Sequence, residues 1–404
     1  MRISLKNERT LEKACVIWLI LSSGAVFYSK INMLLCMIIM IALSLLLLFK
    51  VNRGKIGQKN LIAAGLVLGY GFLTCLVNGM NGFSVNDFLI FGGSLFFLAV
   101  ITSIITVKQF QEIFINCIYV ISIISLICFA VVMILPNVKL PFEMSIARVN
   151  WTGTFYYTLG FYGRRISRNA GVFGEGGVFQ IFLNLALFYL VQSDEPIKHK
   201  NRKMFILIAT LLTTVSSMGY IVLVLVIFSM MLKNNVAQKK YYLLGVICIV
   251  AIIVVDASSG LLSEKILNQG GSFGSRYDDT IVSIETANEK PLFGYGVAND
   301  LSEAWEAHIH SESRMTNPSY VLLQRSSGLG LVLMRCGYPF LLIYVMSMFS
   351  YFKKTINYSL AIHLIGTLIL VFGIINEPIQ FTPIFMLSFF TWKSSDEGGK
   401  MSEV

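Results

Sequence analysis

The sequence predicts an all-α fold: a polytopic integral membrane helix bundle with about 12 transmembrane helices and two large external loops. Of the 404 residues, 55% are hydrophobic and 13% are charged, whereas ordinary soluble domains are about 45–50% apolar and about 25% charged. The apolar residues form long continuous runs, without the apolar–polar alternation of a lipid-facing β-strand. These observations exclude a soluble enzyme and argue against a water-filled barrel.

Transmembrane spans are predicted from the apolar runs, because about 20 apolar residues cross a bilayer. Residues 1–30 lack a small-residue cleavage site, which predicts a retained signal anchor. The apolar stretch 204–232 has basic loops at both ends, so we predict two short helices there that turn near Ser216. The predicted spans run roughly over residues 14–29, 31–49, 61–77, 88–107, 113–135, 174–192, 204–216, 218–232, 241–255, 329–351, 358–375 and 381–392.

The distribution of charge predicts the orientation of these spans. The net charge is +10, and most basic residues lie in short segments between alternate apolar runs. The positive-inside rule assigns those segments to the cytoplasm, which places both termini there. The positive charge therefore reflects topology, and a nucleic-acid partner is not predicted. The segments hold Arg2, Lys6, Arg9, Lys13, Lys50, Arg53, Lys55, Lys59, Lys108, Lys198, Lys200, Arg202, Lys203, Lys233, Lys239, Lys240, Lys353, Lys354, Lys393 and Lys400.

Two external segments are much longer than the other connections, and loops of this length are usually functional or disordered. Both contain many aromatic residues, which argues for folded loops over the membrane. The predicted division of the chain is 1–135 for transmembrane helices 1–5, 136–173 for the first external loop, 174–255 for helices 6–9, 256–328 for the second external loop, and 329–404 for helices 10–12 with a cytoplasmic tail.

The first external loop ends in several arginines, including Arg165 and Arg168, followed by a glycine-rich stretch that contains Glu175. One interpretation is that long loops are translocated whatever their charge. The other is that planar, bidentate guanidinium groups bind phosphate at the membrane surface, with backbone amides at the helix start approaching the same anion. An ionisable Glu175 at membrane depth is a functional candidate or an ion-pair partner for one of the arginines.

The second external loop carries Arg276, His308, His310 and Arg314. Two alternate histidines without a nearby third ligand do not make a zinc site, so no metal is predicted. One histidine could serve as a base or as a hydrogen-bond donor to a sugar, or both could be plain surface residues. The seven cysteines all lie inside apolar runs, which favours helix packing over disulfides.

The order of these motifs resembles the O-antigen polymerase and ligase superfamily, in particular the Wzy-type polymerases of O-antigen or capsular repeat units. The resemblance rests on R-N-A-G-V-F-G-E from Arg168 to Glu175, G-S-R ending at Arg276, P-L-F-G-Y-G at 291–296, and N-P-S-Y from Asn317 followed by G-L-G. The chain departs from the family where a proline often follows the acidic residue, since Gly176 stands there.

The resemblance implies a metal-independent, integral-membrane glycosyltransferase without a cofactor, whose donor is an oligosaccharide linked to undecaprenyl pyrophosphate. Arg168 and Arg276 would hold the pyrophosphate, with Arg165 and Arg314 assisting. Glu175 or His310 would activate the acceptor hydroxyl. The implied location is the bacterial cytoplasmic (inner) membrane with the active site on its external face, and a chain-length regulator and a flippase are implied partners.

Three functions remain open from the sequence. A polymerase would extend O-antigen, capsule or exopolysaccharide by joining lipid-linked repeat units, and a ligase would move the finished glycan to its acceptor. A lipid-linked oligosaccharide flippase or other transporter is the third, but transporters usually carry charges within their spans. Here Arg335 is the only basic residue deep inside a predicted span, so we favour the polymerase.

Overall fold

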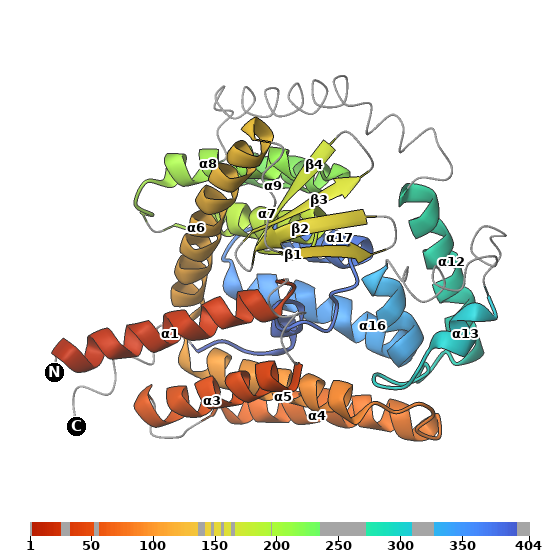
Figure 1. Cartoon of the computed structure of the whole chain (residues 1–404). Coiled ribbons are helices and arrows are strands. Elements are labelled where there is room, and N and C mark those ends of the chain that lie inside the picture. The colour runs from red at the N-terminus through yellow and green to blue at the C-terminus, as the bar shows by residue number, and fades with distance from the viewer. Residues whose placement is uncertain are drawn as a thin grey trace, which may run out of the picture.

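The protein is a helical bundle with one small antiparallel sheet (Figure 1). The computed structural model describes residues 2–25, 33–51, 56–135, 142–146, 149–154, 157–162, 166–194, 196–234, 272–308 and 327–393. Its helices are α1 (Arg2–Ser22), α3 (Met33–Val51), α4 (Gln58–Val77), α5 (Val85–Ile104), α6 (Val107–Ile134), α7 (Gly176–Gln192), α8 (Lys200–Thr213), α9 (Ser217–Asn234), α12 (Ser272–Glu289), α13 (Ser302–Glu306), α16 (Gly328–Thr355), α17 (Leu360–Asn376), α18 (Pro383–Met386) and the 3₁₀ turn η1 (Leu387–Phe389).

The apolar helices make this a membrane protein. Within the described ranges, α4, α5, α6 and α16 are long and apolar enough to cross a bilayer, and α3, α7, α9 and α17 contain shorter apolar helices. The predicted number of twelve spans is not confirmed. The predicted span 241–255 lies outside the described residues. Helix α8 has 14 residues, so it is about 21 Å long, less than the roughly 30 Å hydrocarbon core.

Helix α7 is the centre of the bundle. All of its residues are buried, because α6, α8, α9, α17 and strand β4 pack around it. A helix that is apolar on every side is stable only when it is covered on every side. The stack of Phe173 on Phe182 and the edge-to-face contact of Phe188 with Phe352 fill the space around it. The two ends of α7 are therefore fixed points for the rest of the molecule.

The all-α prediction is wrong for residues 142–171. This part of the predicted first loop forms a sheet in the order β1-β2-β3-β4, with every neighbouring pair antiparallel. The strands are β1 (Phe142–Ile146), β2 (Val149–Thr154), β3 (Tyr157–Tyr162) and β4 (Ile166–Gly171). Aromatic and β-branched residues favour strands, but the pattern within the loop did not reveal which segments pair. Strand β4 packs on α6, α7 and α8, which joins the sheet to the bundle.

The predicted helical span 381–392 is also wrong. The structure has only α18 and η1 there, and the remaining residues between Glu377 and Lys393 are not helical. Most side chains of this segment are nevertheless buried or partly buried. Non-helical backbone is tolerated at membrane depth only where protein covers it, and the segment meets this condition because α5, α16 and α1 enclose it.

Polar side chains bind this C-terminal segment along its length. The Tyr344 hydroxyl donates to Gln380 O at 2.6 Å. At the far end, Asn60 Oδ1 accepts from Thr391 N at 2.9 Å and Asn60 Nδ2 donates to Thr391 O at 2.8 Å. Lys393 N then donates to Thr102 O. The chain thus returns from the end of α17 to the end of the bundle where α4 begins and α5 ends, although it does so without a long helix.

The segment between α12 and α13 inserts between α4 and α16. Helix α16 is interrupted at Gly337, whose φ is 77°, two residues before Pro339. The exposed backbone there is satisfied by the inserted segment, since Tyr295 N donates to Met334 O at 2.8 Å. The Tyr70 hydroxyl lies 2.9 Å from Leu292 O. A left-handed glycine and a proline together therefore create the gap that receives this segment.

Candidate functional site

The junction between β4 and α7 places Arg168 and Glu175 at one end of the bundle. Asn169 anchors the junction, because its Nδ2 donates to Thr213 Oγ1 at 2.9 Å and its Oδ1 accepts from Gly171 N at 3.0 Å. Gly171 has a φ of 58°, which a glycine adopts without strain. The chain then turns into α7 with Glu175 as its N-cap, in an extended conformation and with no side-chain cap hydrogen bond.

Arg168 faces the turn between α8 and α9. Its guanidinium is close enough to Tyr220, in the first turn of α9, to interact with it electrostatically. The Tyr220 hydroxyl donates to Leu212 O at 2.9 Å, which fixes the ring. Arg168 is partly buried, so its charge acts in a medium less polar than bulk water. Such an environment strengthens its attraction to an anion.

A second carboxylate, Glu377, lies against the same end of α7. It follows the last residue of α17 and is only 3% exposed. Gly177 leaves room for it, since a Cβ at that position would overlap Glu377 Oε1. Asn376 Nδ2 donates to the same oxygen at 3.2 Å. A carboxylate at a helix N-terminus is favoured by the helix dipole, which accounts for an acidic group at this depth.

Helices α16 and α12 extend this end of the bundle. A Cβ at Gly328 would come within 2.6 Å of Glu377 O and within 2.8 Å of Gln380 Oε1, so the start of α16 packs directly on the segment after α17. Gly330 packs in the same way on Ser283 of α12. Arg276 lies in α12 seven residues before Ser283, about two helical turns earlier. Arg168, Glu175, Glu377 and the α12 face thus belong to one continuous set of packed elements.

A smaller polar cluster forms where α12 ends. Glu289 accepts a short hydrogen bond from the Tyr295 hydroxyl, and its Oε1 lies 3.3 Å from His308 Nε2. The pKa of Tyr295 is raised, first by burial and then by its bond to Glu289. His308 Nδ1 lies 3.0 Å from Ala304 O. Both ring nitrogens of His308 are therefore held by defined partners, which fixes the orientation of the ring.

Arg335 stabilises the inserted segment. Its Nη1 donates to Val297 O at 2.5 Å and lies within 3.4 Å of Gly296 O and 3.3 Å of Asn299 O. These three carbonyl groups belong to the end of the P-L-F-G-Y-G motif and to the turn that follows it. The one basic residue predicted deep inside a span is thus bound to backbone oxygens at the edge of a loop, as is usual for a structural arginine.

The structure describes only some of the predicted site residues. Arg168 and Glu175 lie together at the start of α7, as described above. Arg165, His310 and Arg314 lie outside the described residues, and Arg276 is described only by its position in α12. Sequence analysis missed Glu377, although the signal was present, because an acidic residue directly after an apolar run is a functional candidate.

The described ranges contain no cluster of side chains that could bind a metal ion and no disulfide. No group of three or more His, Cys, Asp or Glu residues is placed to hold a metal ion there. The six cysteines that the structure describes are all free thiols, buried or partly buried. This agrees with the interpretation of these cysteines as packing residues.

Comparison with known proteins supports the resemblance that the sequence predicts. Residues 204–336 match the family described as O-antigen ligase. The match covers 133 of the 404 residues. No curated protein matches the chain.

The matched region covers only part of the site. It contains α8, α9, α12, α13 and the beginning of α16, and so it includes Arg276, His310, Arg314 and the Glu289–Tyr295–His308 cluster. Arg168, Glu175 and Glu377 lie outside the match to the O-antigen ligase family. They come next to the matched region only through the packing around α7.

Proposed function

We propose that this protein is a polymerase of oligosaccharide repeat units linked to undecaprenyl pyrophosphate. The observation that carries the proposal is that Glu175 and Glu377 lie at the start of α7. The strand β4, which carries Arg168, packs on the same helix, and residues 204–336 match the O-antigen ligase family. A cation and two carboxylates at one end of a membrane bundle suit a transfer between a phosphorylated donor and a sugar hydroxyl. The product would be O-antigen, capsule or exopolysaccharide.

In the proposed reaction, the acceptor hydroxyl attacks C1 of the donor sugar. The bond between C1 and the pyrophosphate oxygen breaks, and undecaprenyl pyrophosphate leaves with the electron pair. Arg168 and Arg276 hold the pyrophosphate and neutralise its developing charge, assisted by Arg165 and Arg314. In other reactions with a phosphate leaving group, a metal ion neutralises the charge that develops on it. Here the guanidinium groups would do so, and the proposal therefore needs no metal or other cofactor.

The proton of the acceptor hydroxyl goes to a base. Glu175 and His310 are the candidates from the sequence, and the packing adds Glu377. A buried carboxylate close to a reacting hydroxyl is a suitable general base when its geometry is fixed. The contacts of Glu377 with Gly177 and Asn376 supply that fixed geometry. Glu175 would then orient Arg168 or the acceptor.

The proposed location is the bacterial inner membrane, with both termini in the cytoplasm and the site on the external face. The charge distribution supports this orientation through the positive-inside rule. In this arrangement a flippase delivers lipid-linked repeat units to the external face, and a chain-length regulator acts on the growing polymer.

The test is complementation of a strain that lacks the gene. Cells with the wild-type protein should display a ladder of polymer lengths on a gel, whereas cells with an inactive variant should accumulate single repeat units. Loss of the ladder with normal amounts of single units supports the polymerase. Single units that polymerise normally without the protein would contradict it.

A ligase is the second candidate, and the description of the matched family favours it. The same experiment separates the two functions. Without a ligase, the glycan would still polymerise but would remain on its lipid carrier. A transporter is disfavoured, because Arg335 binds loop carbonyl groups and is thereby withdrawn from any transport path.

A further inference from the structure

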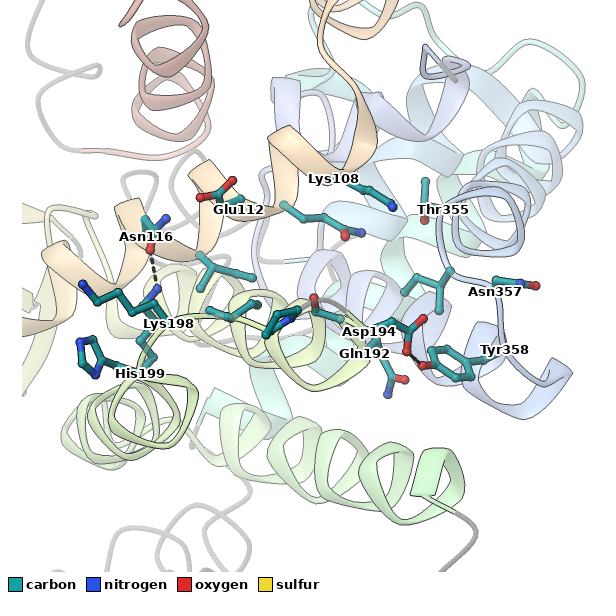
Figure 2. A pocket seen from close by; sticks show the side chains of 17 residues that line it. Lys108, Glu112, Asn116, Gln192, Asp194, Lys198, His199, Thr355, Asn357 and Tyr358 are labelled. Carbon is teal, nitrogen blue, oxygen red and sulfur yellow. Dashed lines mark hydrogen bonds between the residues drawn. The ribbon is translucent and has the colours of Figure 1, made fainter. Parts of the chain in front are cut away.

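A cavity lies at the opposite end of α7 from the proposed reaction site. It has a volume of about 630 Å³, and it is lined by residues from the start of α6, the end of α7, the start of α8 and the α16–α17 connection (Figure 2). Helix α7 has 17 residues, so about 25 Å separates the two sites. By the positive-inside rule, this end faces the cytoplasm.

Three basic side chains belong to the polar lining of the cavity. Lys108 comes from α6, Lys198 from the connection before α8, and Lys203 from α8 itself. Two carboxylates, Glu112 and Asp194, also line the cavity. Figure 2 shows Lys108 and Glu112 on α6, and Asp194 and Lys198 on the connection between α7 and α8, around the cavity. The lining therefore has more positive than negative side chains.

Asp194 is already engaged within the protein. Its Oδ1 lies 3.1 Å from Lys233 Nζ and accepts a short hydrogen bond from the Tyr358 hydroxyl. Lys233 Nζ also donates to Ser193 O at 2.9 Å and lies 4.7 Å from the centre of the Tyr358 ring. This network fixes one wall of the cavity and neutralises the Asp194 charge with a lysine that does not line it.

Lys203 forms the buried part of the opposite wall. It is 8% exposed, and its Nζ donates to Asn116 Oδ1 at 2.6 Å. Burial lowers its pKa, and the charge of Glu112 only partly opposes this shift. A cation at this depth is costly unless an anion compensates it. An anionic ligand in the cavity would supply that compensation.

The start of α8 adds a second attraction for anions. Its N-cap, His199, lines the cavity with a φ of 57° and makes no side-chain cap hydrogen bond. The first amide groups of a helix lack intrahelical partners and carry partial positive charge. A phosphate oxygen is a suitable acceptor for such groups. The lysines and the helix start thus favour the same kind of ligand.

The surroundings of the cavity indicate the source of the phosphate. Ile115, Ile197 and Ile356 supply apolar lining, and the apolar side chain of Phe205, two residues after Lys203, is 73% exposed on the surface of the bundle. Basic pockets between helices at the cytoplasmic surface are typical binding sites for phospholipid headgroups. We propose that this cavity binds the phosphate of a membrane phospholipid headgroup. This inference is independent of the proposed glycosyl transfer.

The test uses the full-length protein in detergent and dihexanoyl phosphatidylglycerol, a short-chain phospholipid, as the probe. The apparent affinity is read from the rise of the unfolding temperature with probe concentration. The variant Lys108→Ala/Lys198→Ala changes two exposed lining residues, and Lys353→Ala/Lys354→Ala is the matched control because it removes two exposed lysines at the same end of the bundle that do not line the cavity. We expect the first variant to bind at least tenfold more weakly than wild type and the control to bind like wild type.

Lys203→Met is a further variant. When it folds, it should bind the phospholipid probe more weakly than Lys108→Ala/Lys198→Ala does. Equal weakening in both double variants would overturn the proposal, because it would show attraction to the surface charge alone. Binding by the cavity variant within twofold of wild type would also overturn it. Sodium phosphate at the same concentrations distinguishes the sources: weak binding of phosphate supports a lipid, and binding as tight as that of the lipid would overturn the lipid assignment in favour of a soluble phosphate compound.

Discussion

At Arg168 and Arg276, the proposed role depends on the guanidinium fork as well as on charge. Arg→Lys keeps the charge but loses the planar, bidentate geometry, and Arg→Ala loses both. We expect each lysine variant to lose about 2 to 4 kcal/mol of transition-state stabilisation, or roughly 30- to 1000-fold in rate. Single repeat units should then accumulate on a glycan gel. A normal ladder in both lysine variants, at equal expression, would contradict the proposal that Arg168 and Arg276 hold the pyrophosphate.

Glu377 gives a second prediction at the residue scale. Glu377→Gln keeps the shape of the side chain and the contact with Asn376 but removes the negative charge. If Glu377 is the base, polymer formation should fall by roughly 100-fold or more while the unfolding temperature stays close to that of wild type. The control is Glu303→Gln, at an exposed position on α13. An unchanged ladder would assign the base to Glu175 or His310.

Gly177 tests the fit between Glu377 and α7 by another route. Gly177→Ala should displace the Glu377 side chain, because the new Cβ would overlap Oε1, and it should therefore reduce polymer formation. Gly65→Ala, in α4, is the control, because no atom lies within 4 Å of its new Cβ. There the helix should gain up to about 1 kcal/mol from the better helix propensity of alanine. Equal polymer formation in both variants would refute the close contact at Gly177.

At the scale of elements, the C-terminal segment shows how polar side chains replace a helix. Asn60 is 3% exposed and binds Thr391 through both its amide nitrogen and its oxygen. Asn60→Ala would remove the hydrogen-bond partners of the Thr391 backbone groups, which lie in a partly buried place. We expect a loss of about 2 kcal/mol or more in stability, measured by thermal unfolding in detergent. Asn81→Ala, at an exposed position, should leave the unfolding temperature nearly unchanged; an equal loss there would contradict the assignment.

For the whole molecule, the topology is the prediction on which the site depends. The loops 136–173 and 256–328 should lie outside the cytoplasm, with both termini inside. Single cysteines introduced at Ser145 and Ser302 of a cysteine-free variant should react with a membrane-impermeant reagent in intact spheroplasts. A cysteine near the N-terminus should react only after permeabilisation. The reverse labelling pattern would contradict both the predicted topology and the proposed active site.

The packing of the whole bundle also explains the position of the site. Helix α7 is enclosed on all sides, so substrates can approach only its ends. One end carries Arg168, Glu175 and Glu377, and the other faces the lysine-lined cavity. A single central helix therefore separates the proposed chemistry from the proposed phospholipid site.

The sequence by itself predicted a helical membrane protein that resembles the O-antigen polymerase and ligase superfamily, and residues 204–336 match the O-antigen ligase family. Long apolar runs and ordered short motifs are local properties of the chain, and a local pattern is sufficient to predict them. It also placed Arg168 and Glu175 as candidates, because both lie in one such motif. The sequence also showed that Arg335 is the only basic residue deep in a predicted span. It could not show which carbonyl groups Arg335 binds.

Tertiary structure alone decided what depends on partners distant in sequence. The strands between Phe142 and Gly171 became visible only through their pairing. The segment after α17 crosses the interior without a long helix because α5, α16 and Asn60 supply contacts and hydrogen bonds to it. Glu377 became a candidate because it meets Gly177, 200 positions earlier in the chain. Contacts of this kind are set by packing and by the cost of unpaired polar groups in an apolar interior, and no local pattern encodes them.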